Sequence, residues 1–346
     1  MSTFAQTRAA LETALRSIQI FSETSYSFAG QPAQQVNLAP PPGYYPASEH
    51  EEPLVRDLQG VLYANCYMRP FSGTPEPLPP SNGIDHQLIA HLTQANVGQD
   101  GWEGGWRIYQ LGQGGTIYVQ KGERSRSALP GEYVSTSAPG MAMRPGMIVN
   151  LRIVRESTQL QSGFYYAFGQ ELSDRLDEFN LVRFYFNIKH EGVTGLFHFI
   201  TTALNQFQVP FRMKCVNAPA HFIRADGAVL YVAKRHYRFV AELLSSMPAE
   251  VARQLRTPVP LFSKKIMDGV GIAEDPGNGE SFGMHRCLLV AKGIVDAWEN
   301  GEQTVEARLE AVQKRFAEQG LDLNKPHINA GSADYYELPQ PLELTP

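Results

Sequence analysis

Hydrophobic residues recur at three- and four-residue spacing along several stretches of the chain, which is the pattern of amphipathic helices. The clearest example is the apolar stripe that runs from Cys287 to Trp298. The pattern predicts helices over residues 3–20, 54–68, 84–96, 236–246, 281–300 and 302–319. One more helix, with the sequence GLFHFITTALNQFQ, is expected between two predicted strands.

Apolar and polar residues alternate in the other parts of the chain, which indicates β-strands. Glycine turns interrupt the alternation between residues 102 and 155, as is typical of antiparallel strands. Three further β-rich segments cover residues 181–190, 209–216 and 228–234. Because strands and helices mix without a strict β-α-β order, the sequence predicts an α+β fold with a mixed, mainly antiparallel sheet flanked by helices.

The distribution of these elements also predicts a domain organisation. Residues 29–53 are rich in proline and polar residues, which is typical of an extended connector. We expect a mainly helical N-terminal region over residues 1–100, suited to peptide or partner recognition. An α+β catalytic domain over 101–320 and a C-terminal tail over 321–346 would follow.

Composition narrows the class of protein. The net charge of -5 argues against a nucleic-acid partner. The apolar runs are shorter than the roughly 18 residues that cross a bilayer, and Arg8 and Arg16 interrupt what would be a signal sequence. Cys66, Cys215 and Cys287 are too widely spaced for a disulfide framework or a metal knuckle. We therefore expect a cytoplasmic protein that binds neither nucleic acid nor membrane.

Cationic side chains gather on two of the predicted strands. Alternation places Arg183 and Tyr185 on one face of the first strand, and Arg212 and Lys214 on one face of the second. If both strands belong to one sheet, the four side chains converge, and Arg224 would add another cation. A solvent-facing sheet surface explains the alternation equally well.

Such a cluster, without a pair of carboxylates or metal-ligand spacing, suits a phosphorylated substrate. Guanidinium groups bind phosphate oxygens through two parallel hydrogen bonds. The like charges around Lys214 would lower its pKa, so that it could act as a general base near neutral pH. This chemistry requires no metal or organic cofactor.

Two more titratable residues, His285 and Arg286, lie in the first turns of the helix predicted over 281–300. Cations at that end of a helix are unfavourable unless an anion lies between them and the helix, and a phosphate would serve. Three acidic residues offer Arg286 a purely structural partner: Glu274, Asp275 and Glu280.

Four segments of the sequence resemble the HopA-type effector family. They are VRFYFNI, LNQFQVPFRMKC, RADGAVLYVA and PLFSKKIMDGVGIAEDPGNGESFGMHR. The resemblance covers roughly residues 100–300. It implies a core similar to that of the phosphothreonine lyases OspF and SpvC, and relatives encoded beside lanthipeptide genes are thought to act as lyases after a separate kinase.

The resemblance also implies roles for individual residues. Lys214 occupies the position of the general base. Tyr185 replaces the histidine that serves the lyases as general acid, so His285 becomes the rival candidate. Four arginines would bind the phosphate group: Arg183, Arg212, Arg224 and Arg286.

The function implied by this resemblance is metal-independent β-elimination without a cofactor. Phosphate would leave a phosphoserine or phosphothreonine of a precursor peptide, giving dehydroalanine or dehydrobutyrine in lanthipeptide-type biosynthesis. The implied partners are that phosphorylated peptide and a kinase. The alternative is a phosphopeptide-binding module or secreted effector that does not turn its ligand over.

Overall fold

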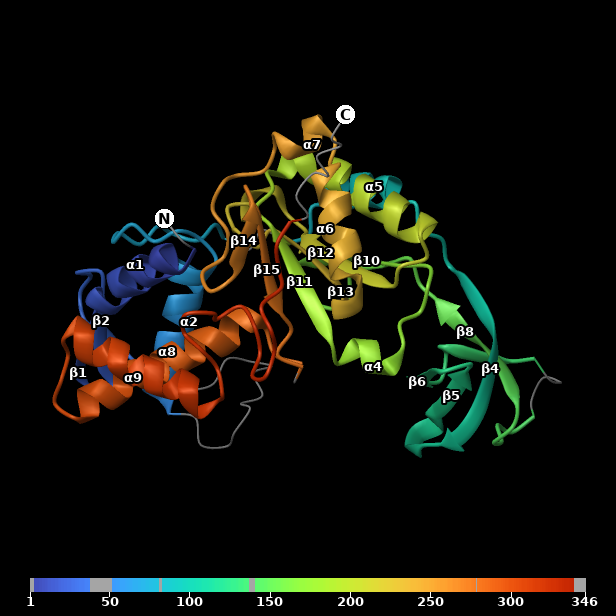
Figure 1. The fold of residues 1–346 in the computed structure, drawn as a ribbon, viewed down its shortest axis with the longest axis horizontal. Coiled ribbons are helices and arrows are strands. Elements are labelled where there is room, and N and C mark those ends of the chain that lie inside the picture. The colour runs from blue at the N-terminus through green and yellow to red at the C-terminus, as the bar shows by residue number, and fades with distance from the viewer. Residues whose placement is uncertain (1–2, 38–51, 81–82, 137–140, 278, 339–346) are drawn as a thin grey trace, which may run out of the picture.

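Antiparallel sheets and helices make up the computed structural model, which describes residues 3–37, 52–80, 83–136, 141–277 and 279–338. Within these residues the strands form three sheets, and every strand pairing is antiparallel. The largest sheet lies at the centre, between a helical lobe and a smaller sheet (Figure 1). The predicted α+β class is confirmed.

The central sheet carries the strands on which the cationic residues were predicted. Its seven strands follow the order β14-β15-β11-β13-β12-β10-β9. Their bounds are Glu156–Ser157 for β9, Phe164–Phe168 for β10, Leu181–Phe186 for β11, Phe211–Val216 for β12, Ala228–Ala233 for β13, Lys264–Met267 for β14 and Val270–Glu274 for β15. The strands predicted over 181–190, 209–216 and 228–234 are thus neighbours in one sheet.

One face of the central sheet is covered by helices and is mainly apolar, with Glu274 of β15 as a buried exception. Phe184 and Phe186 of β11 and Met213 of β12 are buried there in a single cluster with Ile200 and Val240. The main covering helices are α3 (His86–Ala95), α5 (His190–Gln206) and α6 (Tyr237–Ser245). Shorter helices lie in the connections: α4 (Arg175–Glu178), η3 (Pro219–His221), η4 (Lys234–His236) and α7 (Ala249–Ala252). Burial of this face leaves the polar residues of the same strands on the opposite face.

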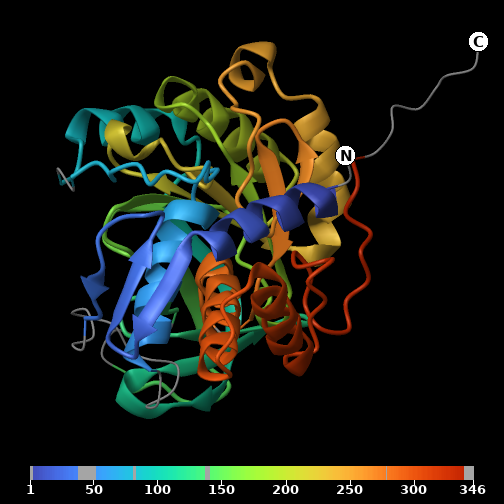
Figure 2. The same ribbon diagram turned by 90° about the vertical axis from the view of Figure 1, so that its left-hand side faces the viewer.

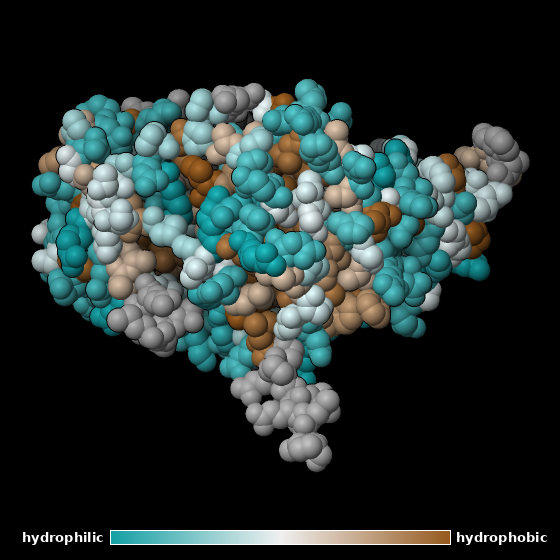
Figure 3. Space-filling view, turned by 90° about the horizontal axis from the view of Figure 1, so that it is seen from above, coloured by the Kyte–Doolittle hydropathy of each residue, from teal (hydrophilic) through white to brown (hydrophobic). Residues whose placement is uncertain are grey.

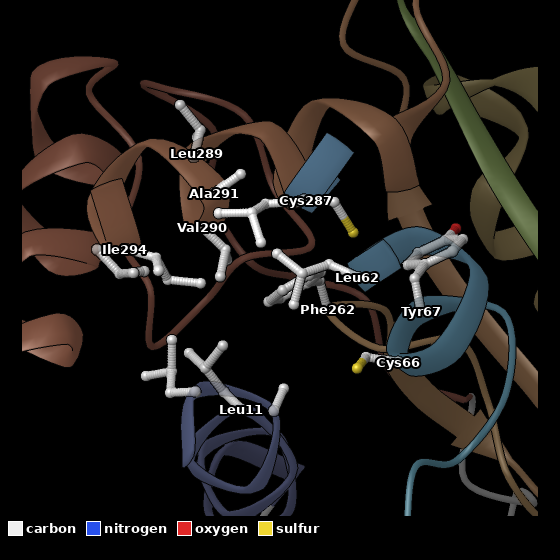
Figure 4. Packing of buried hydrophobic residues seen from close by; sticks show 14 of the residues in the cluster. Leu11, Leu62, Cys66, Tyr67, Phe262, Cys287, Leu289, Val290, Ala291 and Ile294 are labelled. Atoms are coloured by element: carbon white, nitrogen blue, oxygen red, sulfur yellow. The ribbon is translucent and has the colours of Figure 1, made fainter. Parts of the chain in front are cut away.

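A helical lobe packs beside that opposite face. It contains α1 (Thr3–Arg16), α2 (Pro53–Leu62), the π-helical turn η1 (Tyr63–Tyr67), α8 (Phe282–Glu299), α9 (Val305–Glu318) and a sheet of β1 (Ile18–Ser22), β2 (Ser25–Phe28) and β3 (Gln34–Gln35). Elements from both ends of the sequence lie side by side (Figure 2). Figure 4 shows their common core, in which Leu11, Leu62 and Ile294 meet. The helices α1 and α2 therefore pack on the C-terminal helices α8 and α9.

The third sheet lies at the far end of the molecule from the helical lobe (Figure 1). It has the order β6-β5-β4-β8-β7 and a small core of its own around Trp106. Its elements are β4 (Gly101–Leu111), η2 (Gln113–Gly115), β5 (Ile117–Lys121), β6 (Arg124–Ala128), β7 (Tyr133–Ser135) and β8 (Ile148–Ile153). The antiparallel strands predicted between residues 102 and 155 are confirmed.

The structure differs from the sequence predictions at the first helix and at the β14–β15 hairpin. The first helix ends at Arg16, not residue 20, because the β-prone sequence from Ile18 to Ser22 pairs with β2. The β14–β15 hairpin was not predicted, since glycines obscure the apolar pattern of its strands. Gly271 is required there because a Cβ atom would lie 2.6 Å from Ser263 Oγ. Part of the predicted connector, residues 38–51, lies outside the described residues.

The C-terminal tail predicted over 321–346 is described as far as residue 338. Contacts of its residues reach both α8 and β15. The proposed domain division at residues 100 and 320 stays a prediction. The surface seen from above is mainly hydrophilic with small hydrophobic areas (Figure 3), and none of the described helices has the length and apolarity to cross a membrane.

The close approach of α8 and α9 depends on Gly293. A Cβ atom at this position would lie 2.6 Å from the backbone nitrogen of Val312 and 2.7 Å from its Cα. We expect Gly293→Ala to lower the free energy of unfolding by about 1–3 kcal/mol, measured by urea denaturation, because backbone atoms cannot yield without moving α9.

The matched control is Gly60→Ala in α2, where the added Cβ atom meets nothing within 4 Å. That variant is expected to unfold like the wild type or to gain up to about 1 kcal/mol. A Gly293→Ala variant as stable as the control would contradict this account of the helix packing.

Candidate functional site

A cavity of about 620 Å³ lies between the polar face of the central sheet, η1 and the start of α8. Five of the predicted site residues line it: Arg183, Tyr185, Arg212, Lys214 and Arg224. Arg183 is only 7% exposed, so this is not the solvent-facing sheet surface that alternation alone left open. The structure therefore brings these five side chains together.

Strand register explains this convergence. Arg212 of β12 pairs with Tyr231 of β13, which pairs with Arg183 of β11. Two residues further along, Lys214 of β12 and Tyr185 of β11 both pair with Val229 of β13. Residues paired across antiparallel strands point to the same face. With strands about 4.8 Å apart, the two ends of each row are separated by roughly 10 Å between Cα atoms.

Lys214 has the environment of a base. Its Nζ donates a hydrogen bond to Gln161 Oε1 at 2.9 Å and lies 4.3 Å from the centre of the Phe164 ring. Burial lowers the pKa of Lys214 to about 8, and the positive charges of Arg183 and Arg224 act in the same direction. A useful fraction of the amine is therefore neutral near physiological pH.

Arg183 and Arg224 are each held by a carboxylate. Arg183 Nη2 lies 2.6 Å from Asp275 Oδ2 and donates to the carbonyl oxygen of Glu280 at 2.7 Å. Arg224 donates from Nε and Nη2 to the two oxygens of Asp226, both at 2.8 Å. These pairs fix the orientation of the guanidinium groups and neutralise much of their charge.

Arg212 differs from the other two arginines because no carboxylate in the described part of the chain pairs with it. Its Nε is buried without a hydrogen-bond partner there. Its guanidinium carbon lies 4.5 Å from the centre of the Tyr231 ring, and that of Arg183 lies 5.3 Å from the same ring. Among these arginines, Arg212 is therefore the cation best placed to bind an added anion.

The start of α8 provides a further source of positive potential. Ser281, its N-cap residue, and Met284 in its first turn line the cavity. The side chain of Ser281 makes no capping hydrogen bond at this end of the 18-residue helix. Unpaired N–H groups and the helix dipole favour an anion at such an end.

His285 and Arg286 do not line the cavity, unlike the other five predicted site residues. Residues in a helix advance by about 100°, so position 286 faces nearly opposite to Met284. Arg286 is 1% exposed and donates to the carbonyl oxygens of Pro326 at 2.8 Å and Ile328 at 3.2 Å. His285 Nδ1 lies 2.7 Å from Arg286 Nη1, and burial lowers the pKa of His285 to about 4.

Two of the three acidic partners considered for Arg286 are engaged elsewhere. Glu274 is fully buried and binds Lys234 Nζ at 2.8 Å and the Tyr336 hydroxyl at 2.6 Å. Asp275 binds Arg183. Arg286 therefore donates to main-chain carbonyl oxygens, where a phosphate or a carboxylate was predicted as its partner.

Several cavity residues were missed by sequence reasoning. Tyr231 was the one polar side chain in the apolar segment AVLYVA, and Asp226 stands two residues after Arg224. Both were signals that could have been used. Tyr63 fell within a helical pattern, and nothing in the sequence pointed to Gln161. In the described residues, no group of three or more His, Cys, Asp or Glu side chains is placed to hold a metal ion.

These positions predict opposite effects for two arginine substitutions. Arg286→Lys should lower the free energy of unfolding by about 1–3 kcal/mol because buried carbonyl groups lose donors. Its affinity for inorganic phosphate should be unchanged. Arg212→Gln should weaken phosphate binding about tenfold, with little effect on stability. Isothermal titration calorimetry and urea denaturation measure the two quantities, and a loss of phosphate binding in Arg286→Lys would contradict the assignment.

Comparison with known proteins places this site in a family. The sequence model of the HopA1 effector protein family matches residues 155–328, just over half of the chain. The effector protein from Pseudomonas syringae pv. tomato strain DC3000 has a similar solved structure, with 17% identity, a TM-score of 0.37, and coverage of 48% of this chain and 63% of that one. The effector protein from P. syringae pv. syringae strain 61 gives 19% identity, a TM-score of 0.36 and the same coverages.

The match thus spans less than two thirds of either effector's length. No curated protein matches this chain. The family match includes β11, β12 and β13 together with the start of α8, which are the elements that form the cavity. The chain belongs to the HopA1 effector protein family.

Proposed function

We propose that this protein is a lyase that eliminates phosphate from phosphoserine or phosphothreonine in a peptide. The observation that carries the proposal is one cavity that holds both a lysine with a lowered pKa and an arginine without a carboxylate partner in the described residues. The first suits proton abstraction and the second suits phosphate binding. The proposed elimination needs both side chains, because the proton and the phosphate leave the same substrate residue.

The phosphate group of the substrate would bind at Arg212. Arg183 and Arg224 keep further N–H groups available beyond those that their carboxylates accept, since a guanidinium has five. The first N–H groups of α8 approach from the other wall. Together these donors would balance the charge of the phosphate and of the leaving group.

Elimination begins when the neutral amine of Lys214 takes the proton from Cα of the substrate residue. The electron pair of that C–H bond forms the Cα=Cβ double bond, and the Cβ–O bond breaks. The ester oxygen leaves with the phosphate, so the products are a dehydroamino acid and inorganic phosphate. No electron acceptor is consumed.

Tyr185 would serve as the proton donor to the departing phosphate. A monoanionic ester leaves as hydrogen phosphate, whereas a dianion needs one more proton. Burial raises the pKa of the Tyr185 hydroxyl while the Arg183 charge opposes that shift, so the hydroxyl remains protonated at neutral pH. His285 is not proposed for this role because it lies outside the cavity.

We extend the proposal to the biosynthetic setting that the family resemblance implies. A peptide kinase would supply the phosphoester on a precursor peptide in the cytoplasm. The products, dehydroalanine and dehydrobutyrine, are electrophiles that a later cyclisation step of lanthipeptide-type biosynthesis would consume. No metal or organic cofactor takes part in the proposed reaction.

A second candidate function is phosphopeptide binding by an effector, without turnover. It is favoured by the absence of a histidine among the described residues that line the cavity. In that case Lys214 would act only as a charge that holds the phosphate.

Substitution of Lys214 separates the two functions. Lys214→Arg keeps the positive charge but removes the titratable amine, so we expect phosphopeptide affinity within several-fold of wild type and loss of the dehydrated product. Lys214→Ala should likewise abolish turnover. Mass spectrometry detects the product, and fluorescence anisotropy measures binding. Wild-type turnover in Lys214→Arg would contradict the mechanism, and no product from wild type would favour the binding protein.

The pH dependence provides an independent test. Because Lys214 must be neutral in the free enzyme, kcat/KM should rise about tenfold per pH unit and level off above its pKa of about 8. The phosphate ester titrates near pH 6, below this range. Steady-state kinetics with a phosphoserine peptide measure the profile, and a rate independent of pH between about 6.5 and 9 would exclude Lys214 as the base.

A further inference from the structure

A second cavity, of about 370 Å³, adjoins the cationic one on the same face of the central sheet. The two cavities share Arg212 and Tyr231 in their walls. Strand register accounts for this, because Leu181 and Ala233 pair with each other one row beyond the row of Arg183 and Tyr231. The second cavity is thus the continuation of the first along the strands.

Half of the residues that line the second cavity are apolar: Phe168, Gly169, Leu172, Leu181, Pro210, Phe211 and Ala233. Charged residues make up most of the other half. The acidic residues at its rim are paired with arginines from neighbouring elements. Asp177 binds Arg235 at 2.7 Å and Glu178 binds Arg126 at 3.2 Å. The cavity therefore offers an apolar surface whose rim carries little unbalanced charge.

The five-stranded sheet helps to build this cavity. Arg126 of β6 lines it and donates to the carbonyl oxygen of Ser173 at 2.7 Å. Arg124 donates to the carbonyl oxygen of Leu172, whose side chain packs on the core of that sheet. These contacts hold residues 171–173 over the edge of the cavity and give the smaller sheet a part in shaping it.

The distance between the two cavities matches neighbouring residues of one peptide. Successive rows on one face of a strand are about 6.6 Å apart, whereas an extended peptide advances by about 3.3–3.6 Å per residue. A peptide that runs along the strands with its phosphorylated residue at the row of Arg212 would therefore bring a side chain about two residues away to Leu181 and Ala233.

We infer that the second cavity binds an apolar side chain of the substrate peptide, within two residues of the phosphorylated residue. The inference rests on the proposed function, because it takes the phosphate to lie at Arg212. Its ligand is a leucine, isoleucine or phenylalanine side chain, which the apolar walls favour over a charged one. Arg212 and Tyr231 would then separate the phosphate from the apolar contact.

The test uses the Lys214→Arg variant, which is expected to bind the peptide without eliminating phosphate. Its affinity is measured for fluorescent phosphoserine peptides that carry leucine or aspartate at one of the two positions before or the two positions after the phosphoserine. At one of these positions leucine should bind roughly tenfold or more tightly than aspartate. Adding Ala233→Leu, which fills the cavity, should remove that preference while binding of inorganic phosphate stays unchanged. Equal affinities at all four positions would overturn the inference.

A second variant guards against misfolding in the first. Leu181→Asp places a charge in the same wall at a partly exposed position. This substitution should weaken binding of the leucine peptide and strengthen binding of a peptide with lysine at the same position. No change in preference would count against the inference. A preference for leucine with equal affinity for the phosphorylated and unphosphorylated peptides would support the apolar site and overturn the phosphate site of the proposed function, so the two failures are distinguishable.

Discussion

The ion pair between Arg183 and Asp275 is the interaction on which the cavity depends. Both residues are less than a tenth exposed, and the same guanidinium donates to the carbonyl oxygen of Glu280. Arg183 lies in the middle of the central sheet, whereas Glu280 immediately precedes the N-cap of α8. One side chain therefore joins the two walls of the cavity. Removal of either partner would leave a buried charge, at a cost of about 3–5 kcal/mol.

The C-terminal segment extends this anchoring. Asn329 donates from its side chain to the carbonyl oxygen of Asp275 at 2.6 Å and from its backbone to Glu274 Oε2 at 2.8 Å. Arg286 holds the carbonyl oxygens of the same segment from the other side. A cation near the start of α8 is thus stabilised by the partial negative charge of main-chain oxygens. It stabilises the segment from which Asn329 contacts Asp275.

The sequence predicted the parts of the site that follow from local periodicity. Alternation in β11 and β12 placed Arg183, Tyr185, Arg212 and Lys214 on one face, and sheet formation then had to bring them together. The sequence could not show where the Arg286 side chain lies. A helix presents residues in every direction, and only packing determines which of its faces meets the sheet. The β14–β15 hairpin was not predicted for a related reason. Its glycines are required by tertiary contacts, which the local sequence pattern does not reveal.

The balance of charge in the cavity explains why so many arginines accompany one lysine. Asp226 and Asp275 neutralise Arg224 and Arg183, which leaves Arg212 and Lys214 as the cations without a carboxylate partner in the described residues. A bound phosphate dianion would raise the pKa of Lys214 and so weaken it as a base. Arg183 opposes that effect, because its charge lowers the same pKa, whereas Asp226 raises it. In the proposed reaction, phosphate binding and proton abstraction would therefore coexist only if fixed cations, rather than Lys214 itself, carried the charge of the phosphate.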